Sequence, residues 1–208
     1  MKGNYDNVAP FYDLLSQLVF GNAILRAQLF LINAIPANSG ILIIGGGTGQ
    51  ILEEISKKHG SGLQITYVDI SKKMIAISKK RKTGNNEVVF INQSISDARF
   101  HRQFDVVITP FFLDNFLNNT AKVVFDKIDT FLKPRGFWLF TDFQLSEKNN
   151  LWQKLLLKIM YFFFRFFCGI EASHLPDTTA LFEKYKYQLV SKQTFYKKFI
   201  YALIFFKP

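Results

Sequence analysis

The chain has 208 residues, of which 49% are hydrophobic and 20% are charged, which excludes a disordered chain and allows one domain with a substantial core. Its single cysteine, Cys168, excludes an internal disulfide and a zinc site built from several cysteines, and we expect no metal. The formal net charge of +10 suits a nucleic acid or an anionic membrane, but no RNA-binding signature accompanies it, so we do not expect a nucleic-acid partner.

The first predicted element is a long helix over residues 8–35, where leucines recur at roughly helical spacing. The all-apolar run 41–44 that follows is typical of a strand buried on both faces of a parallel sheet. The elements predicted next alternate between helix and strand: a helix over 50–59, a strand over 64–68, a helix over 71–82, strands over 88–92 and 104–109, a helix over 120–132 and a strand over 136–142. This alternation predicts a parallel sheet with right-handed crossovers.

The C-terminal part predicts a different arrangement. Residues 151–168 form a largely apolar helix, and the strand-like runs 187–196 and 199–206 have little between them. These two runs predict an antiparallel pair that closes the sheet. We therefore expect a single α/β domain over residues 1–208, with a mostly parallel sheet of seven strands and an antiparallel strand near the C-terminal end.

The clearest chemical signal is a glycine-rich turn after the first strand. Gly45, Gly47 and Gly49 stand at alternate positions, and their missing side chains let the backbone approach a ligand closely. The third glycine of the dinucleotide fingerprint is absent, because its position falls on Gln50 or Leu52. The turn therefore indicates a ligand other than a pyrophosphate cofactor.

Asp69 ends the second predicted strand, 20 residues after Gly49. A carboxylate at this point can accept hydrogen bonds from the hydroxyls of a ribose. The alternative is an acid at the start of a helix, beside Ser71 as the N-cap, where the helix dipole stabilises it. The glycine turn and Asp69 together are more specific than either feature alone.

Five segments of the sequence resemble known motifs. "ILIIGGGTGQ", "YVDIS", "FDVVITPFFLDNF" and "LKPRGFWLFTDF" are similar, in order and spacing, to the motifs of the class I S-adenosylmethionine (SAM)-dependent methyltransferases. "YDNVAPFYDLLS" resembles the N-terminal helix of the ubiquinone and menaquinone methyltransferases. The resemblance implies a Rossmann-like fold and SAM as cofactor. It also implies a SAM-binding core over about residues 37–143 and an acceptor-covering helix within about 147–180.

The resemblance implies a role for individual positions. Asp69 would hold the ribose of SAM, Ile70 would pack on the adenine, Ser94 and Ile95 would contact the adenine, and Thr109 would lie beside the methionine moiety. The glycine turn would pass under that moiety, and a tyrosine of the first helix would cover the pocket or pack in the core. The candidate cofactor-binding residues are Gly45, Gly46, Gly47, Thr48, Gly49, Asp69, Ile70, Ser94, Ile95, Thr109 and Tyr12.

Two positions depart from the family pattern. Ile43 stands where the family has an acid that orders the methionine end, a role that a water could take instead. Ser94 stands where the family often has an aspartate for the adenine amino group, for which Asp97 is an alternative. A SAM-binding protein without catalysis therefore stays open as an alternative.

No catalytic base stands out. Methyl transfer from a sulfonium is an in-line displacement, which depends more on alignment than on an acid or base. His174 lies in a turn-rich loop after the fifth strand and is a candidate general base, with an ordinary surface histidine as the alternative.

Three arrangements are open for the helix over 151–168, which carries the polar stripe Lys154, Lys158, Tyr161 and Arg165. It can roof an apolar acceptor pocket, lie on a membrane surface or form a homodimer face. Three cations argue against a membrane span.

We expect SAM-dependent methyl transfer to a small apolar or aromatic acceptor, quinone- or lipid-like. A tRNA or protein methyltransferase is the alternative that the charge favours, but "TPFF" stands where an "NPPY"-type tetrapeptide would be expected. The polar residues 1–7 lack signal-peptide features, so we expect a cytoplasmic protein, with the inner face of a membrane as a further location.

Overall fold

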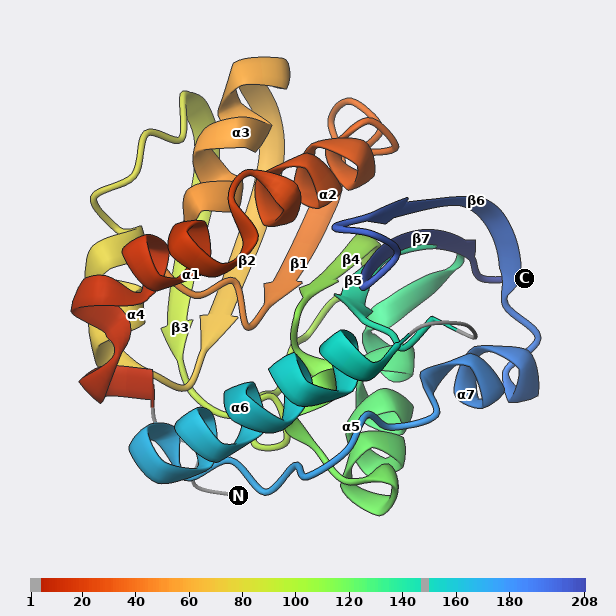
Figure 1. The fold of residues 1–208 in the computed structure, drawn as a ribbon. Helices are drawn as coiled ribbons and strands as arrows, with labels where there is room; N and C mark the ends of the chain where they lie inside the picture. The colour runs from red at the N-terminus through yellow and green to blue at the C-terminus, as the bar shows by residue number, and fades with distance from the viewer. Residues whose placement is uncertain (1–4, 147–149) are drawn as a thin grey trace.

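The computed structural model describes residues 5–146 and 150–208 (Figure 1). The sheet has seven strands in the order β3-β2-β1-β4-β5-β7-β6 within these residues. The strands are β1 (Gly40–Ile44), β2 (Ser61–Asp69), β3 (Asn85–Asn92), β4 (Phe104–Pro110), β5 (Leu132–Phe143), β6 (Gln188–Phe195) and β7 (Ile200–Phe206). Strands β1 to β5 pair in parallel, and β7 is antiparallel to both β5 and β6. This confirms the predicted α/β sheet with an antiparallel C-terminal strand.

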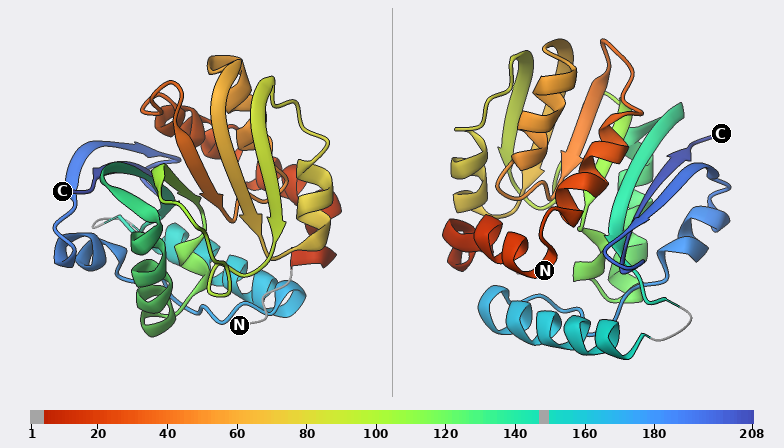
Figure 2. Two further views of the ribbon diagram at one scale, coloured as in Figure 1. Left: turned by 180° about the vertical axis from the view of Figure 1, so that it is seen from behind. Right: turned by 45° about the horizontal axis from the view of Figure 1, so that its top comes forward.

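Helices cover both faces of this sheet, in three layers (Figures 1 and 2). Residues Ile41 and Ile43 of β1 pack into one core cluster, and Leu42 and Ile44 pack into the other, because side chains alternate across a strand. All four side chains are buried, which explains the unbroken apolar run at this point. The first cluster includes α2 (Ala23–Ile32), α3 (Gln50–Lys58) and α4 (Lys72–Ser78), and the second includes α5 (Asn118–Phe131) and α7 (Thr178–Lys184).

The predicted single helix over 8–35 is wrong, because the chain breaks at Gly21. The short 3-10 helix η2 (Ala9–Phe11) leads into α1 (Tyr12–Phe20), and the 9–20 segment meets α2 at an angle of 99°. Gly21 has φ +55, and its backbone N donates to the carbonyl of Gln17 at 2.8 Å, which ends α1. This break lets α2 pack on the sheet while α1 turns over the edge of the sheet.

Other local signals were confirmed or missed. The Ser71 hydroxyl accepts a hydrogen bond from the backbone N of Met74 at 3.1 Å, so Ser71 is the predicted N-cap of α4. Helix α7 was not predicted; it begins after Asp177, whose carboxylate accepts from the backbone N of Ala180. Two 3-10 helices, η1 (Tyr5–Asn7) and η3 (Leu113–Asn115), were also missed.

Helix α6 (Leu151–Cys168) agrees with the helix predicted over 151–168, whereas part of the expected covering segment, residues 147–149, lies outside the described residues. It crosses the molecule beneath the carboxyl ends of β1, β2 and β3, as both figures show (Figures 1 and 2). Helices α1 and α6 therefore border the edge of the sheet at which ligands bind in open α/β folds.

Candidate active site

A cavity of about 200 Å³ lies at the carboxyl ends of β1, β2 and β4, with the N-terminal helices as one wall. The structure brings nine of the eleven sequence candidates to its lining: Tyr12, Gly45, Gly46, Gly47, Thr48, Asp69, Ile70, Ser94 and Ile95. The glycine turn and the acid at the end of β2 therefore share one cavity, as their spacing indicated.

Two candidates lie elsewhere. Thr109 is fully buried, and its hydroxyl accepts a hydrogen bond from the indole N–H of Trp138 at 2.9 Å. Its side chain points to the opposite face of β4, and the next residue, Pro110, lines the cavity instead. Gly49 is the N-cap of α3 at φ +81, and a Cβ there would lie 2.6 Å from the Cβ of Ser78. Thr109 and Gly49 therefore pack against protein and do not line this cavity, unlike the other nine candidates.

His174 is exposed, and its Nδ1 lies 3.2 Å from the hydroxyl of the adjacent Ser173. It lines neither this cavity nor a second, apolar cavity between α1 and α6 that is described below. The geometry therefore offers it no role as a base, and it matches the alternative of a surface histidine.

The glycine turn is in direct contact with Tyr67 of β2. A Cβ at Gly46 would fall 2.4 Å from the hydroxyl oxygen of Tyr67, and that hydroxyl donates to the carbonyl of Gly47 at 2.9 Å. Gly47 has φ +63, which a larger residue adopts only with strain, and a Cβ there would meet no atom within 4 Å. The backbone at Gly47 thus borders open space, which fits the close approach of a ligand.

Asp69 joins the turn to the second strand. Its Oδ2 accepts from the backbone N of Gly47 at 3.1 Å, and its Oδ1 accepts from the backbone N of Ser71 at 2.8 Å. Burial raises the pKa of the carboxyl group to about 6, although both backbone donors lower it. An ionised carboxylate has about four lone-pair sites, so acceptor capacity is left for the two hydroxyls of a ribose.

Gln28 is a buried residue of α2 that lines the same cavity. Its side-chain oxygen, Oε1, has no hydrogen-bond partner within residues 5–146 and 150–208. A buried carbonyl without a donor is costly, and each such group in a folded protein calls for an explanation. The α-ammonium group of SAM has N–H donors that a carbonyl oxygen can accept, and the side chain of Ile43, fully buried in the sheet, has no acceptor atom. These features together fit SAM.

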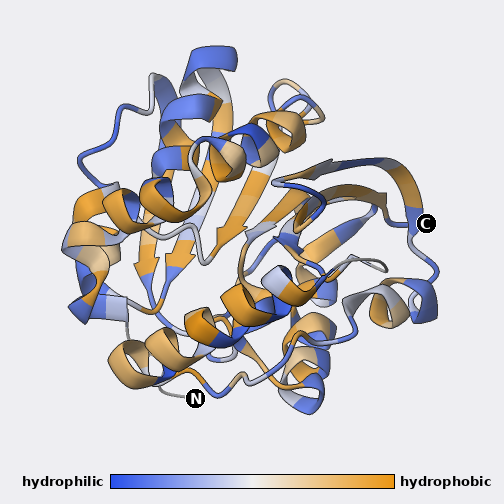
Figure 3. Cartoon of the chain, in the orientation of Figure 1, coloured by the Kyte–Doolittle hydropathy of each residue, from blue (hydrophilic) through white to orange (hydrophobic). Residues whose placement is uncertain are grey.

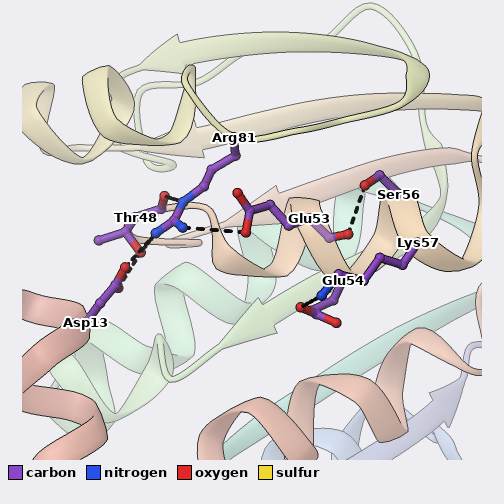
Figure 4. A network of polar contacts seen from close by, with 7 residues as sticks. All are labelled: Asp13, Thr48, Glu53, Glu54, Ser56, Lys57 and Arg81. Atoms are coloured by element: carbon purple, nitrogen blue, oxygen red, sulfur yellow. Dashed lines mark hydrogen bonds and ion pairs between the residues drawn. The ribbon is translucent and has the colours of Figure 1, made fainter.

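Helix α1 is held over the cavity by a polar network (Figure 4). The hydroxyl of Thr48 donates to Asp13 Oδ1 at 2.5 Å, and Arg81 Nη2 lies 2.5 Å from Asp13 Oδ2. Arg81 Nε also donates to the carbonyl of Thr48 at 3.0 Å, and its Nη1 lies 3.6 Å from Glu53. One arginine therefore connects α1, the glycine turn and α3.

A second cavity, of about 160 Å³, adjoins the first between α1 and α6. Seven residues line both cavities: Tyr5, Tyr12, Ser16, Ile24, Phe111, Asn115 and Ile170. The rest of its lining is mostly apolar and comes from both helices, with Leu15 and Val19 on α1 and Leu156, Met160 and Phe163 on α6. A ligand in the second cavity would therefore lie next to a ligand in the first.

One buried aspartate, Asp114, lines this second cavity and a second, Asp142, lies next to it; sequence reasoning missed both. The backbone N of Asp114 donates to Asp142 Oδ2 at 3.1 Å, while Asp114 Oδ1 accepts from Asn115 Nδ2 at 2.9 Å. Burial raises the pKa of Asp114 to about 7, and burial with the neighbouring Asp114 raises the pKa of Asp142 well above its ordinary value. Neither forms an ion pair within the described part of the chain. Their place after β4 and at the end of β5 is the signal that could have revealed them.

Comparisons with known proteins agree with this geometry. Residues 42–138 match the family model of a methyltransferase domain. The ubiquinone/menaquinone biosynthesis C-methyltransferase UbiE of Hydrogenovibrio crunogenus is 26% identical over 169 residues, which are 78% of this chain and 64% of that protein. The matched segment contains the glycine turn and Asp69, so this part of the chain is similar to a methyltransferase domain. A second UbiE, of Wigglesworthia glossinidia brevipalpis, is 29% identical over 170 residues, 79% of this chain and 65% of its own, so both alignments span just under two thirds of the relative.

Solved structures show the same fold. Magnesium protoporphyrin IX methyltransferase from Synechocystis PCC 6803, with bound S-adenosylhomocysteine (SAH), superposes with a TM-score of 0.67 at 13% identity, covering 98% of this chain and 96% of that one. The N-methyltransferase NodS from Bradyrhizobium japonicum WM9, also with SAH, gives a TM-score of 0.62 at 16% identity, covering 89% and 84%. The chain therefore has the fold of these two methyltransferases.

Proposed function

We propose that this protein transfers a methyl group from SAM to a small, largely apolar acceptor with a ring hydroxyl, of quinone-like chemistry. The observation that carries the proposal is the apolar cavity between α1 and α6, because it adjoins the cavity lined by the glycine turn. A few polar groups in an apolar cavity are typical of a small-molecule site. The UbiE relatives, named for ubiquinone and menaquinone biosynthesis, support this acceptor class.

The residues that we assign to the cofactor follow from their places in the first cavity. Asp69 accepts from the ribose hydroxyls, Gln28 accepts from the α-ammonium group, and Ile70, which is partly exposed there, packs on the adenine. Ser94 and Ile95 border the adenine, and the backbone of the glycine turn borders the methionine moiety. Tyr12 lies where both cavities meet and separates the ligands from solvent.

The chemistry at the second cavity centres on Asp114. When bound, SAM supplies an electrophilic methyl group on a sulfonium. The carboxylate of Asp114 accepts a hydrogen bond from the acceptor hydroxyl and takes up the proton that the acceptor releases. A general base works best when its pKa is near the working pH, and burial brings the pKa of Asp114 to about 7. Apolar walls exclude water and align the acceptor with the methyl group.

Transfer of a radiolabelled methyl group from SAM tests the proposal. The full chain is incubated with a panel of three acceptors: a substituted hydroquinone with a short isoprenoid tail, bulk tRNA and a protein extract. We expect label in the hydroquinone, and Asp114→Asn should lower its rate by about 10²–10⁴-fold while SAM still binds. Label only in tRNA or protein would overturn the acceptor class. SAM binding with no transfer to any acceptor would favour a binding protein without catalysis.

A further inference from the structure

The outer face of α6 is an exposed apolar stripe. Its members are Leu151, Leu155, Ile159, Phe162 and Phe166, each between 56% and 81% exposed. Their spacing of four, four, three and four residues places them on one side of the helix. The orange colour of α6 in Figure 3 shows how much of this helix is apolar. Contiguous apolar patches of this kind on the surface of a chain mark an interaction site.

Helix α1 continues the apolar surface on the other side of the acceptor cavity. Leu14 and Leu18 of α1 are 61% and 75% exposed, while Leu15 and Val19 of the same helix line that cavity. On α6, Ile159 is exposed and also lines the cavity. The acceptor cavity is thus bordered on both sides by helices with exposed apolar side chains.

A row of cations runs beside the stripe on α6. Lys154, Lys158 and Arg165 are exposed, and none forms an ion pair with another described residue. Each follows an exposed apolar residue of the stripe by three positions, so the row and the stripe are neighbours on the helix surface. A helix with apolar and cationic faces side by side is typical of one that lies in the interface of an anionic bilayer.

We propose that the protein docks on an anionic lipid surface through the outer face of α1 and α6. The apolar side chains enter the boundary between headgroups and acyl chains, and the cations reach lipid phosphates along their aliphatic stems. Within the residues described, no single helix is long and apolar enough to span a membrane, and the one pair that passes together is bent by 99°. Docking in the plane of the surface needs no span.

A second copy of the chain fits this face less well. In a twofold dimer the same surface faces itself, so the two rows of unpaired cations would lie close together and repel. An anionic lipid surface covers the apolar stripe and neutralises the cations at once. Docking would also bring the border of the acceptor cavity against the bilayer. The docking proposal itself does not depend on the identity of the proposed acceptor.

Vesicle binding by the full chain tests the proposal without any methyl transfer. The two tryptophans differ, because Trp138 is fully buried and Trp152, at the start of α6, is 39% exposed. We expect co-sedimentation with phosphatidylcholine vesicles that contain phosphatidylglycerol and a blue shift of Trp152 emission. Pure phosphatidylcholine vesicles should bind far less, and added salt should weaken binding to the anionic ones.

Variants with a matched charge change locate the surface. Lys154→Gln/Lys158→Gln/Arg165→Gln should weaken binding to anionic vesicles by about 100-fold. Lys58→Gln/Arg135→Gln/Lys186→Gln, with the same net charge, should bind as the wild type does. These three exposed residues lie at the end of α3, near the start of β5 and just before β6, at the ends of the strands opposite to α6, and none forms an ion pair with another described residue. Leu155→Ser/Phe162→Ser/Phe166→Ser should abolish the Trp152 shift. Equal weakening by both sets of charge variants, or dimerisation through α6 with no vesicle binding, would overturn the proposal.

Discussion

The hydroxyl of Thr48 in the glycine turn donates a hydrogen bond to the carboxylate of Asp13 in α1 at 2.5 Å. This bond connects the wall of the cofactor cavity to the helix that covers it. The Asp13 side chain is about half exposed, so the connection is weaker than a buried one and can open for ligand exchange.

Asp13→Ala should loosen this cover. We expect faster release of SAH and a dissociation constant for SAM raised by about 3–10-fold, the effect of losing roughly 1 kcal/mol. Stopped-flow displacement of a fluorescent SAH analogue measures the release rate. Glu53→Gln is the control, since it removes only the long contact with Arg81 and should leave the rate near that of the wild type. Equal rates in all three proteins would show that α1 does not limit release.

Asp69→Ala should weaken SAM binding by about 1.5–3 kcal/mol, the range for hydrogen bonds to a charged group. The carboxylate is buried in the cavity and has acceptor sites left for the ribose. Isothermal titration calorimetry measures the change. Asp97→Ala should have no effect, because Asp97 is exposed and does not line the cavity. If the dissociation constant of Asp69→Ala were unchanged and the fold intact, Asp69 would only hold the glycine turn against β2 and would not bind SAM.

Gln28→Leu should separate two effects. The unfolding free energy should stay constant or rise, because the change removes a buried carbonyl that lacks a partner. Affinity for SAH should fall by about tenfold, because the α-ammonium loses its acceptor. The matched ligand is an SAH analogue without the α-amino group, which wild type and variant should bind equally. A tenfold loss for that analogue as well would refute the pairing of Gln28 with the ammonium.

The buried Asp114 predicts that stability falls as pH rises. Its pKa is about 7 in the folded protein and close to 4 in an unfolded chain, so the folded state holds the extra proton between these values. The free energy of unfolding therefore decreases from about pH 4 to pH 7 through this group. At pH 8, Asp114→Asn should be more stable than the wild type by on the order of 2–4 kcal/mol, and the difference should vanish below pH 4.

Urea unfolding at a series of pH values measures this dependence. Asp126→Asn is the control, because the hydrogen bonds from Tyr185 and Lys122 lower the pKa of Asp126. Its contribution has the opposite sign: it is present at neutral pH and is lost as the pH falls through the lowered value. If Asp114→Asn followed the wild-type curve at every pH, the carboxyl group would not be held protonated in the fold.

The sequence was most informative where one local pattern has one structural solution. The unbroken apolar run 41–44 indicated a strand that is buried on both faces, and Ser71 three residues before Met74 indicated a helix cap, so both could be predicted from neighbouring residues of the sequence. The break at Gly21 was hidden, because leucine spacing continues across it. Thr109 does not line the cavity and Pro110 does, because adjacent side chains of a strand point to opposite faces. Asp114 is contacted by Tyr161 of α6, whose hydroxyl donates to its backbone carbonyl at 3.3 Å, and no local pattern identifies that partner.

The contact of Tyr67 with the glycine turn links two positions 21 residues apart. With a tyrosine at 67, any side chain at 46 collides with the phenol oxygen, and with a small residue at 67 that space opens. Positions 46 and 67 should therefore vary together among homologous chains. A chain with alanine or serine at the first position should carry a residue smaller than tyrosine at the second, and the pair offers a route for redesigning the height of the turn above the sheet.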